Sequence, residues 1–212
     1  MRVHIDLATV LDQRGVAVLV LLDLSAAFDM VDHDILVGRM SSLLGVDSTA
    51  LDWFKSYLTG RQQKVKIGEA WSLAKFLMYS VPQGSVLGPL LFLIYILPLH
   101  RLILSHGLGV HGYADDGQQY LHIKEPDNHQ LVLSECVRIE RCVLDVQQWM
   151  TANKLKLNGE KTEIMVFGTQ QRISDAAITS LSIGGVSVSV SDKPIVNLGA
   201  TLDCTLDMDA HI

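Results

Sequence analysis

The sequence predicts an α+β fold, in which an antiparallel sheet carries helices packed on one face. Two observations predict this class. Short runs of branched or alternating residues indicate strands, whereas longer segments with a period of 3.6 residues indicate helices, in the order strand, helices, hairpin, long helix, hairpin. The chain has 212 residues, 49% of them hydrophobic and 19% charged, which favours one large domain with a packed interior.

The first half of the chain opens with a predicted helix and a buried strand. The strand reads V-A-V-L-V-L-L, and a short run rich in branched residues is typical of a strand covered on both faces. Glycines at 15, 45 and 60 end the helices around it. The predicted elements are a helix at 5–13, the strand at 16–22, helices at 34–44 and 48–58, and a strand at 62–67 that pairs with 76–81.

The second half predicts a hairpin between two long helices, followed by strands. Two short strand patterns surround an acidic, glycine-containing turn, which is typical of a β-hairpin. A polar segment without periodicity, 169–177, suggests a division into residues 1–170 and 171–212. The predicted elements are a helix at 88–104, the hairpin at 109–123, a helix at 127–153, and strands at 155–157, 163–167, 181–190 and 195–202.

Composition excludes several classes of protein. The only continuous apolar stretch in the longest uncharged run is 90–97, which is short against the roughly 20 residues of a membrane span, so no membrane contact is expected. The first residues carry charges where a signal peptide is apolar, which predicts an intracellular protein. Three cysteines without a C-x-x-C pair argue against a disulfide framework or a zinc site. The net charge of −6 is unusual for a protein that binds nucleic acid.

Three carboxylates stand where a metal site is expected. Asp23 follows the buried strand directly, and Asp115 and Asp116 lie at the tip of the predicted hairpin. Two Mg²⁺ ions held by such carboxylates can serve a phosphoryl transfer. Taken alone, however, D-D-G is also ordinary turn chemistry. His33 and His111 have no second ligand at suitable spacing and are interpreted as structural.

The order of motifs along the chain resembles that of reverse transcriptases from non-LTR (LINE-like) retrotransposons. The likeness covers nearly the whole chain, and the ordered set is more specific than any one motif. It rests on D-L-S-A-A-F-D at 23–29, P-Q-G-S-V-L-G-P at 82–89 and Y-A-D-D at 113–116, with further likeness at 59–63, 157–163 and 197–203.

The resemblance implies a polymerase palm and roles for single residues. Asp23 and Asp115 match the principal metal ligands of the family, with Asp116 beside them and the backbone carbonyl of Leu24 as a further ligand. The implied cofactor is a pair of Mg²⁺ ions, or Mn²⁺ in their place. Phe28 matches the aromatic residue that closes the space a ribose 2′-hydroxyl would need. Without Asp23 at that spacing, Phe28 would be read as an ordinary core residue.

Other residues match positions that contact nucleotide or nucleic acid. Gln83 and Gly84 match a segment along the incoming nucleotide, where glycine permits a close approach of the backbone. Lys161 matches a lysine near the triphosphate, although an exposed hairpin lysine is an equal interpretation. Arg61 and Lys64, followed by Lys66, form a short basic stripe that would suit either a nucleic-acid backbone or solvent.

The sequence departs from the family pattern at two positions and in extent. Ser80 stands where a glycine usually precedes V-P-Q-G, and Gly159 replaces a residue that is usually proline. The resemblance implies that the fingers and thumb segments of a parent polyprotein are largely missing here, and that the missing parts carry the basic residues.

The function implied by the resemblance is that of an RNA-directed DNA polymerase (reverse transcriptase). Its partners would be an RNA template, a DNA primer and a deoxynucleoside triphosphate, and its place the nucleus or cytoplasm. One alternative is a truncated, inactive transposon remnant that acts at most as an interaction fragment. A second is another two-metal phosphotransferase or nuclease, against which the position of Phe28 and the P-Q-G segment speak.

Overall fold

The computed structural model describes residues 2–113, 116–158 and 161–207. The chain forms two compact units. The first consists of Met1–Ser25, Leu99–Met150 and Leu157–Ile212, and the second of Ala26–Pro98 and Thr151–Lys156. The predicted division at residues 170 and 171 remains a prediction.

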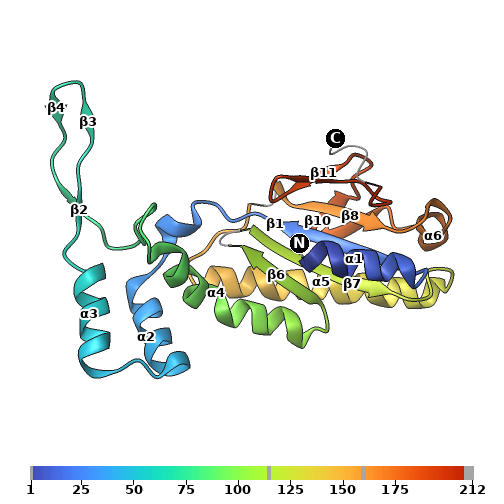
Figure 1. Ribbon diagram of the computed structural model, residues 1–212, viewed down its shortest axis with the longest axis horizontal. Helices are drawn as coiled ribbons and strands as arrows, with labels where there is room; N and C mark the ends of the chain where they lie inside the picture. Colours follow the sequence, from blue (N-terminus) through green and yellow to red (C-terminus); the bar gives the residue numbers. More distant parts are fainter. Residues whose placement is uncertain (1, 114–115, 159–160, 208–212) are drawn as a thin grey trace. The chain divides into compact units, whose positions relative to one another are not determined.

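The first unit is built on a four-stranded antiparallel sheet with the strand order β6-β7-β1-β8 (Figure 1). The central strand β1 is wholly apolar, as predicted for a strand covered on both faces, and pairs with β7 on one side and β8 on the other. The bounds are β1 Val16–Leu22, β6 Gly109–Tyr113, β7 Asp116–Ile123 and β8 Glu163–Phe167.

The long helix α5, His129–Ala152, lies against one face of this sheet. Its contact with the sheet includes the Cys142 Sγ, which is 3.8 Å from the Gln119 Oε1. Gln119 pairs with Val20, so α5 covers the face to which Val20 belongs. The buried residues of α5 recur with helical spacing: Val132, Ile139, Cys142, Val143, Val146 and Met150.

The opposite face of the sheet is covered by the N-terminal helix α1, Arg2–Asp12, and a small hairpin. The hairpin consists of β11, Ile195–Asn197, and β12, Ala200–Leu202. One buried cluster joins the three elements: Val3, Leu7, Val10, Ala17, Leu19, Met165, Phe167, Ile195 and Leu202. The predicted α+β class is confirmed. Helices were expected on one face of the sheet only, whereas α1 covers the second face.

Three short elements at the C-terminal end differ from the prediction. The run 181–190 was predicted as one strand but folds as a hairpin of β9, Ser180–Ile183, and β10, Val186–Ser189, because Gly184 and Gly185 both adopt positive φ. The run 195–202 is likewise a hairpin. The segment without predicted structure contains helix α6, Gln170–Ala176, which begins where the Thr169 side chain accepts a hydrogen bond from the Arg172 N–H.

The second unit contains helices and a long, narrow hairpin. Its helices are the 3-10 helix η1 Ala27–Met30, α2 His33–Leu44 and α3 Ser48–Leu58. The bounds of α2 and α3 match the predicted bounds closely, whereas η1 was not predicted. In α2, the Asp32 side chain caps the first turn, and Gly45 with φ of 66° ends the last. The hairpin consists of β2 Gln62–Gln63, β3 Lys66–Ile67, β4 Ala70–Trp71 and β5 Lys75–Phe76. The two runs predicted to pair, 62–67 and 76–81, are joined only by the pair Gln62–Phe76, because Lys66 and Ile67 pair with Trp71 and Ala70 instead.

Helix α4, Gly88–Ser105, is a long, strongly apolar helix. By length and composition it is the one described helix that could cross a membrane. Buried residues recur along it with helical spacing, as in the core helix of a folded domain: Leu91, Phe92, Tyr95, Ile96, Leu99 and Ile103.

Candidate functional site

Two of the predicted carboxylates lie at the same end of the sheet. The pairing of β1 with β7 ends with Leu22 opposite Gly117. Asp23 is the next residue after Leu22, and Asp116 is the residue before Gly117. The two carboxylates therefore lie on either side of the place where the pairing of β1 with β7 ends.

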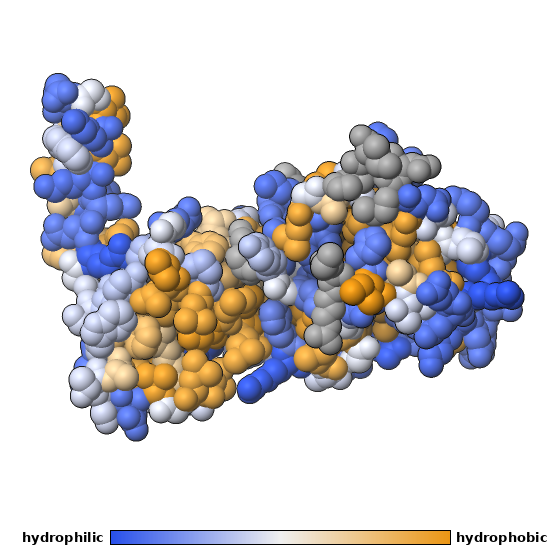
Figure 2. Space-filling model, viewed as in Figure 1, coloured by the Kyte–Doolittle hydropathy of each residue, from blue (hydrophilic) through white to orange (hydrophobic). Residues whose placement is uncertain are grey.

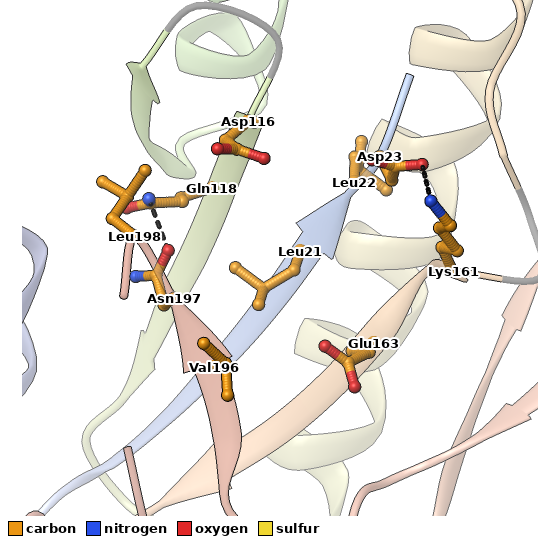
Figure 3. A pocket seen from close by; sticks show the side chains of 11 residues that line it. Leu21, Leu22, Asp23, Asp116, Gln118, Lys161, Glu163, Val196, Asn197 and Leu198 are labelled. Atoms are coloured by element: carbon orange, nitrogen blue, oxygen red, sulfur yellow. Dashed lines mark hydrogen bonds and ion pairs between the residues drawn. The ribbon is translucent and has the colours of Figure 1, made fainter. Parts of the chain in front are cut away.

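Both carboxylates line a cavity of about 400 Å³ on the face that α1 and the β11–β12 hairpin also cover. Figure 3 shows Asp23 at the end of β1, with its carboxylate turned toward Lys161, and Asp116 at the start of β7. The remaining lining comes from β1, β7, β8, β11, the turn after β11 and the segment before β8: Leu22, Gly117, Gln118, Lys161, Glu163, Val196, Asn197 and Leu198.

Asp23 is held by the segment that connects α5 to β8. The Asn158 backbone N–H donates to the Asp23 carbonyl at 2.9 Å, and the Asn158 Nδ2 donates to the Asp23 Oδ2 at 3.1 Å. The Lys161 Nζ forms an ion pair with the same Oδ2 at 3.7 Å. The Lys161 side chain is 70% exposed and that of Asp23 33%, so solvent screens this ion pair and it adds little stability.

Sequence reasoning missed three polar residues that complete this cavity. Glu163 is opposite Leu21 and therefore points to the same face as Asp23. The buried Gln118 donates from its Nε2 to the Asn197 Oδ1 at 2.7 Å, which ties β7 to β11. Alternation within 163–167 would have indicated the direction of Glu163, but the contact between Gln118 and Asn197 spans 79 residues and has no local signal.

The donor set fits a hard cation. Asp23 and Asp116 line one open cavity, and Mg²⁺ commonly binds one or two carboxylates together with substrate phosphates. Within the described ranges, no three His, Cys, Asp or Glu side chains gather as a metal cluster. The third predicted ligand, Asp115, lies outside the described residues. The ligand roles of Asp23, Asp115, Asp116 and the Leu24 carbonyl remain predictions.

The other predicted contact residues belong to the second unit. The Phe28 ring stacks on Phe92, with centroids 4.9 Å apart. The Gln83 Nε2 donates to the Asp29 Oδ1 at 3.4 Å. Gly84 adopts a φ of 76° and an added Cβ would meet open space, so this position favours glycine through its backbone conformation. The nucleotide-contact roles of Phe28, Gln83 and Gly84 remain predictions.

The two histidines make contacts typical of structural residues. The His33 Nε2 lies 2.8 Å from the Ser80 carbonyl oxygen. The His111 Nε2 lies 3.1 Å from the Asp6 Oδ2, which also accepts a hydrogen bond from the Tyr120 hydroxyl at 2.5 Å. The contacts of His111 and Tyr120 with Asp6 join α1 to β6 and β7.

Ser80 stands at a position where the backbone favours glycine. Its φ is 90°, although its N–H donates to Val31 O at 2.9 Å and its carbonyl contacts His33. A side chain in this region costs roughly 1–3 kcal/mol. This explains why a glycine is usual at the position in the family that the sequence resembles.

Ser80→Gly is expected to stabilise the protein by about 1 kcal/mol, because relief of this strain exceeds the added entropy of the unfolded glycine. Urea unfolding followed by circular dichroism would measure the change. The matched control is Ser187→Gly in strand β10, which has no positive φ and is expected to lose roughly 0.5–1 kcal/mol. Equal destabilisation by both substitutions would contradict the strain at Ser80.

Comparison with known proteins identifies the family. The model of the reverse transcriptase (RNA-dependent DNA polymerase) family matches residues 2–202. The chain is 28% identical over 200 residues to a probable RNA-directed DNA polymerase from transposon BS of Drosophila melanogaster, covering 91% of this chain. It is also 28% identical over 196 residues to the RNA-directed DNA polymerase from the mobile element jockey of Drosophila funebris, covering 90% of this chain. The chain spans about a fifth of the length of these relatives, 21% and 20% respectively.

Solved structures with a similar fold include telomerases. The apo telomerase of Candida tropicalis, truncated from its C-terminal domain, aligns with a TM-score of 0.62 and 12% identity over 97% of this chain and 39% of that one. The telomerase of Candida albicans in complex with a fragment of telomeric RNA aligns with a TM-score of 0.59 and 11% identity over 95% of this chain and 33% of that one. At such identities the likeness concerns the fold, which is the palm-like fold predicted. The chain therefore belongs to the reverse transcriptase (RNA-dependent DNA polymerase) family, as a domain of the LINE-like retrotransposon type.

Proposed function

We propose that this chain is the catalytic palm of an RNA-directed DNA polymerase. In the reaction, the 3′-hydroxyl of a DNA primer attacks the α-phosphate of a deoxynucleoside triphosphate, the bond to the β-phosphate oxygen breaks, and pyrophosphate leaves. The observation that carries the proposal is that Asp23 and Asp116 line one cavity where the pairing of β1 with β7 ends. The family membership and the RNA bound to the Candida albicans telomerase support an RNA template as the partner.

The carboxylates of Asp23, Asp115 and Asp116, with the Leu24 carbonyl, would hold two Mg²⁺ ions. When bound, these ions would stabilise negative charge on the attacking and leaving oxygens. Asn158 holds both the backbone and the side chain of Asp23, which supports Asp23 as a preorganised ligand.

Lys161 has a second role in this proposal. In the free protein its ammonium pairs with Asp23 at 3.7 Å and offsets the charge of that carboxylate. A cation between the carboxylates would take over that neutralisation, and the exposed Lys161 side chain could then turn to the triphosphate. There it would offset charge that develops on the departing pyrophosphate. Phe28, Gln83 and Gly84 would contact the incoming nucleotide, as the family resemblance implies.

Metal binding tests the proposal on the 212-residue chain itself. Titration with Mn²⁺, followed by electron paramagnetic resonance, is expected to show binding that Asp23→Asn and Asp116→Asn each weaken at least about tenfold. One unit of charge beside a cation is worth a few kcal/mol at an effective dielectric constant of 20.

The matched control is Asp52→Asn, which removes the same charge from an exposed ion pair with Lys55 in α3. It is expected to leave Mn²⁺ binding unchanged. Equal binding by the parent and both site variants would overturn the proposed metal centre.

A further inference from the structure

Residues 61–79 form a narrow two-stranded hairpin, here called the arm, with no core of its own (Figure 1). Every residue from 62 to 76 is exposed. An isolated two-stranded hairpin is only marginally stable in water, and exposed apolar side chains grouped together indicate an interaction surface. Large hydrophobic residues on the arm include Val65, Ile67, Trp71, Leu73, Phe76 and Met78. The arm is therefore suited to hold a partner.

The charge of the arm indicates an anionic partner. The arm contains one acidic residue, Glu69, and four basic residues, Arg61, Lys64, Lys66 and Lys75. Its net charge is therefore +3, within a chain of net charge −6. In Figure 2 hydrophilic and hydrophobic residues lie side by side on its surface. A surface that mixes exposed cations with apolar groups suits a polyanion that also presents flat apolar rings.

Aromatic rings and cations are adjacent on the arm. Lys66 pairs across the strands with Trp71, and its Nζ lies 5.5 Å from the centroid of the Trp71 ring. The Trp71 side chain is 62% exposed, which leaves ring surface open to solvent. Bases stack on such rings, while neighbouring cations contact phosphates. In a duplex the base faces are already stacked, so this combination favours a single strand.

At the base of the arm, Arg61 lies beside a cavity of about 800 Å³ that Gln63, Phe76 and Gln83 also line. One terminal guanidinium nitrogen of Arg61 is buried and has no hydrogen-bond partner within the described ranges. The guanidinium carbon lies 5.8 Å from the centroid of the Tyr57 ring. A planar guanidinium with an unused donor suits a phosphate oxygen. Asp29 also lines the cavity, but it accepts a hydrogen bond from Gln83.

We propose that the arm binds single-stranded nucleic acid. A base stacks on Trp71, and the phosphates of the strand contact Arg61 and the lysines at 64, 66 and 75. The identity of this strand as the unpaired template rests on the proposed polymerase function, whereas the binding itself does not.

Fluorescence anisotropy of a labelled oligouridylate tests the proposal with the 212-residue chain. A length of about 15 nucleotides suits, since single-strand sites span roughly 4–16 nucleotides. EDTA is present and nucleotides are absent, so a failed metal centre cannot affect the result. Trp71→Ala is expected to raise the Kd at least about fivefold, because stacking on an aromatic ring is worth roughly 1–3 kcal/mol per base. Trp71→Phe should restore most of the binding.

The matched control for Trp71→Ala is Trp53→Ala, which removes a tryptophan that is 53% exposed on helix α3, outside the arm. It is expected to leave the Kd unchanged. Equal effects of the two substitutions, or equal competition by duplex RNA, would overturn the proposal. If Trp71→Ala instead converts a self-associated parent to a monomer in sedimentation and leaves the Kd unchanged, the partner is a second copy of the chain and the proposal fails.

The charged part of the site has its own control. The triple substitution Lys64→Gln, Lys66→Gln and Lys75→Gln should make the plot of log Kd against log salt concentration shallower by about 2, since each phosphate contact to a single strand contributes roughly 0.7. The same change at three exposed lysines outside the arm, Lys124, Lys154 and Lys193, alters the net charge equally. An equal loss of slope in both triple variants would show a general charge effect and contradict the arm as the site.

Discussion

Replacement of Asp23 by asparagine is expected to lower primer extension by a polymerase that contains this domain by on the order of 10³-fold. Asparagine has nearly the same shape, and the Asn158 N–H contact to the residue 23 carbonyl does not depend on the side chain. The fold around β1 is therefore retained while one metal-binding charge is lost. The loss should appear in kcat, because the charge stabilises groups whose own charge develops only during phosphoryl transfer.

The measurement is extension of a DNA primer on an RNA template in Mg²⁺, with the affinity for primer and template measured separately. Asp52→Asn serves as the control, since it removes one acidic charge from α3 and is expected to extend primers like the parent. Extension by Asp23→Asn at the rate of the parent would contradict the role of Asp23 as a metal ligand. A fall in template affinity alone would also contradict it.

The sequence predicted the sheet well where one local rule decided the structure. The run V-A-V-L-V-L-L became β1 with its predicted bounds, and helix α3 begins and ends where its periodicity indicated. The hairpin of β11 and β12 was missed because its turn is formed by Leu198 with φ of 50° and Gly199 with φ of 80°. A leucine rarely adopts this conformation, so no turn preference indicated it.

The candidate site was predictable in part from strand alternation and register. The sequence placed Asp23 after a buried strand and Asp116 at the tip of a hairpin, but only the structure shows that Leu22 pairs with Gly117 and so joins the two places. The support of Asp23 by Asn158 was not predicted. That contact spans 135 residues and depends on how the end of α5 returns to β1, which no local pattern encodes.

The net charge of the whole chain was a poor guide to nucleic-acid binding, whereas the charge of the arm alone was informative. A total of −6 argued against a nucleic-acid protein, yet the arm at 61–79 carries +3. Phosphate contact depends on cations within about one Debye length, roughly 8–10 Å, so a local excess acts almost independently of distant acids. The acidic total is therefore compatible with a basic binding surface in the same chain.

Phe167→Ala is expected to destabilise the first unit by about 3–5 kcal/mol, the range for loss of a buried aromatic ring. The Phe167 side chain is fully buried in the cluster that joins α1, β1, β8 and the β11–β12 hairpin. The surroundings have little freedom to fill the space, because β8 is fixed by its pairing with the central strand β1.

Urea unfolding followed by circular dichroism measures this loss, and Phe76→Ala is the control. The Phe76 side chain is 64% exposed on the arm, so the same truncation there should change stability by no more than roughly 0.5 kcal/mol. A loss below about 1 kcal/mol for Phe167→Ala would mean that this cluster does not hold the sheet together. The same cluster holds β11 to the sheet through Ile195, and β11 lines the cavity at Asp23 with Val196 and Asn197. A small loss would therefore also contradict the support of that cavity by this cluster.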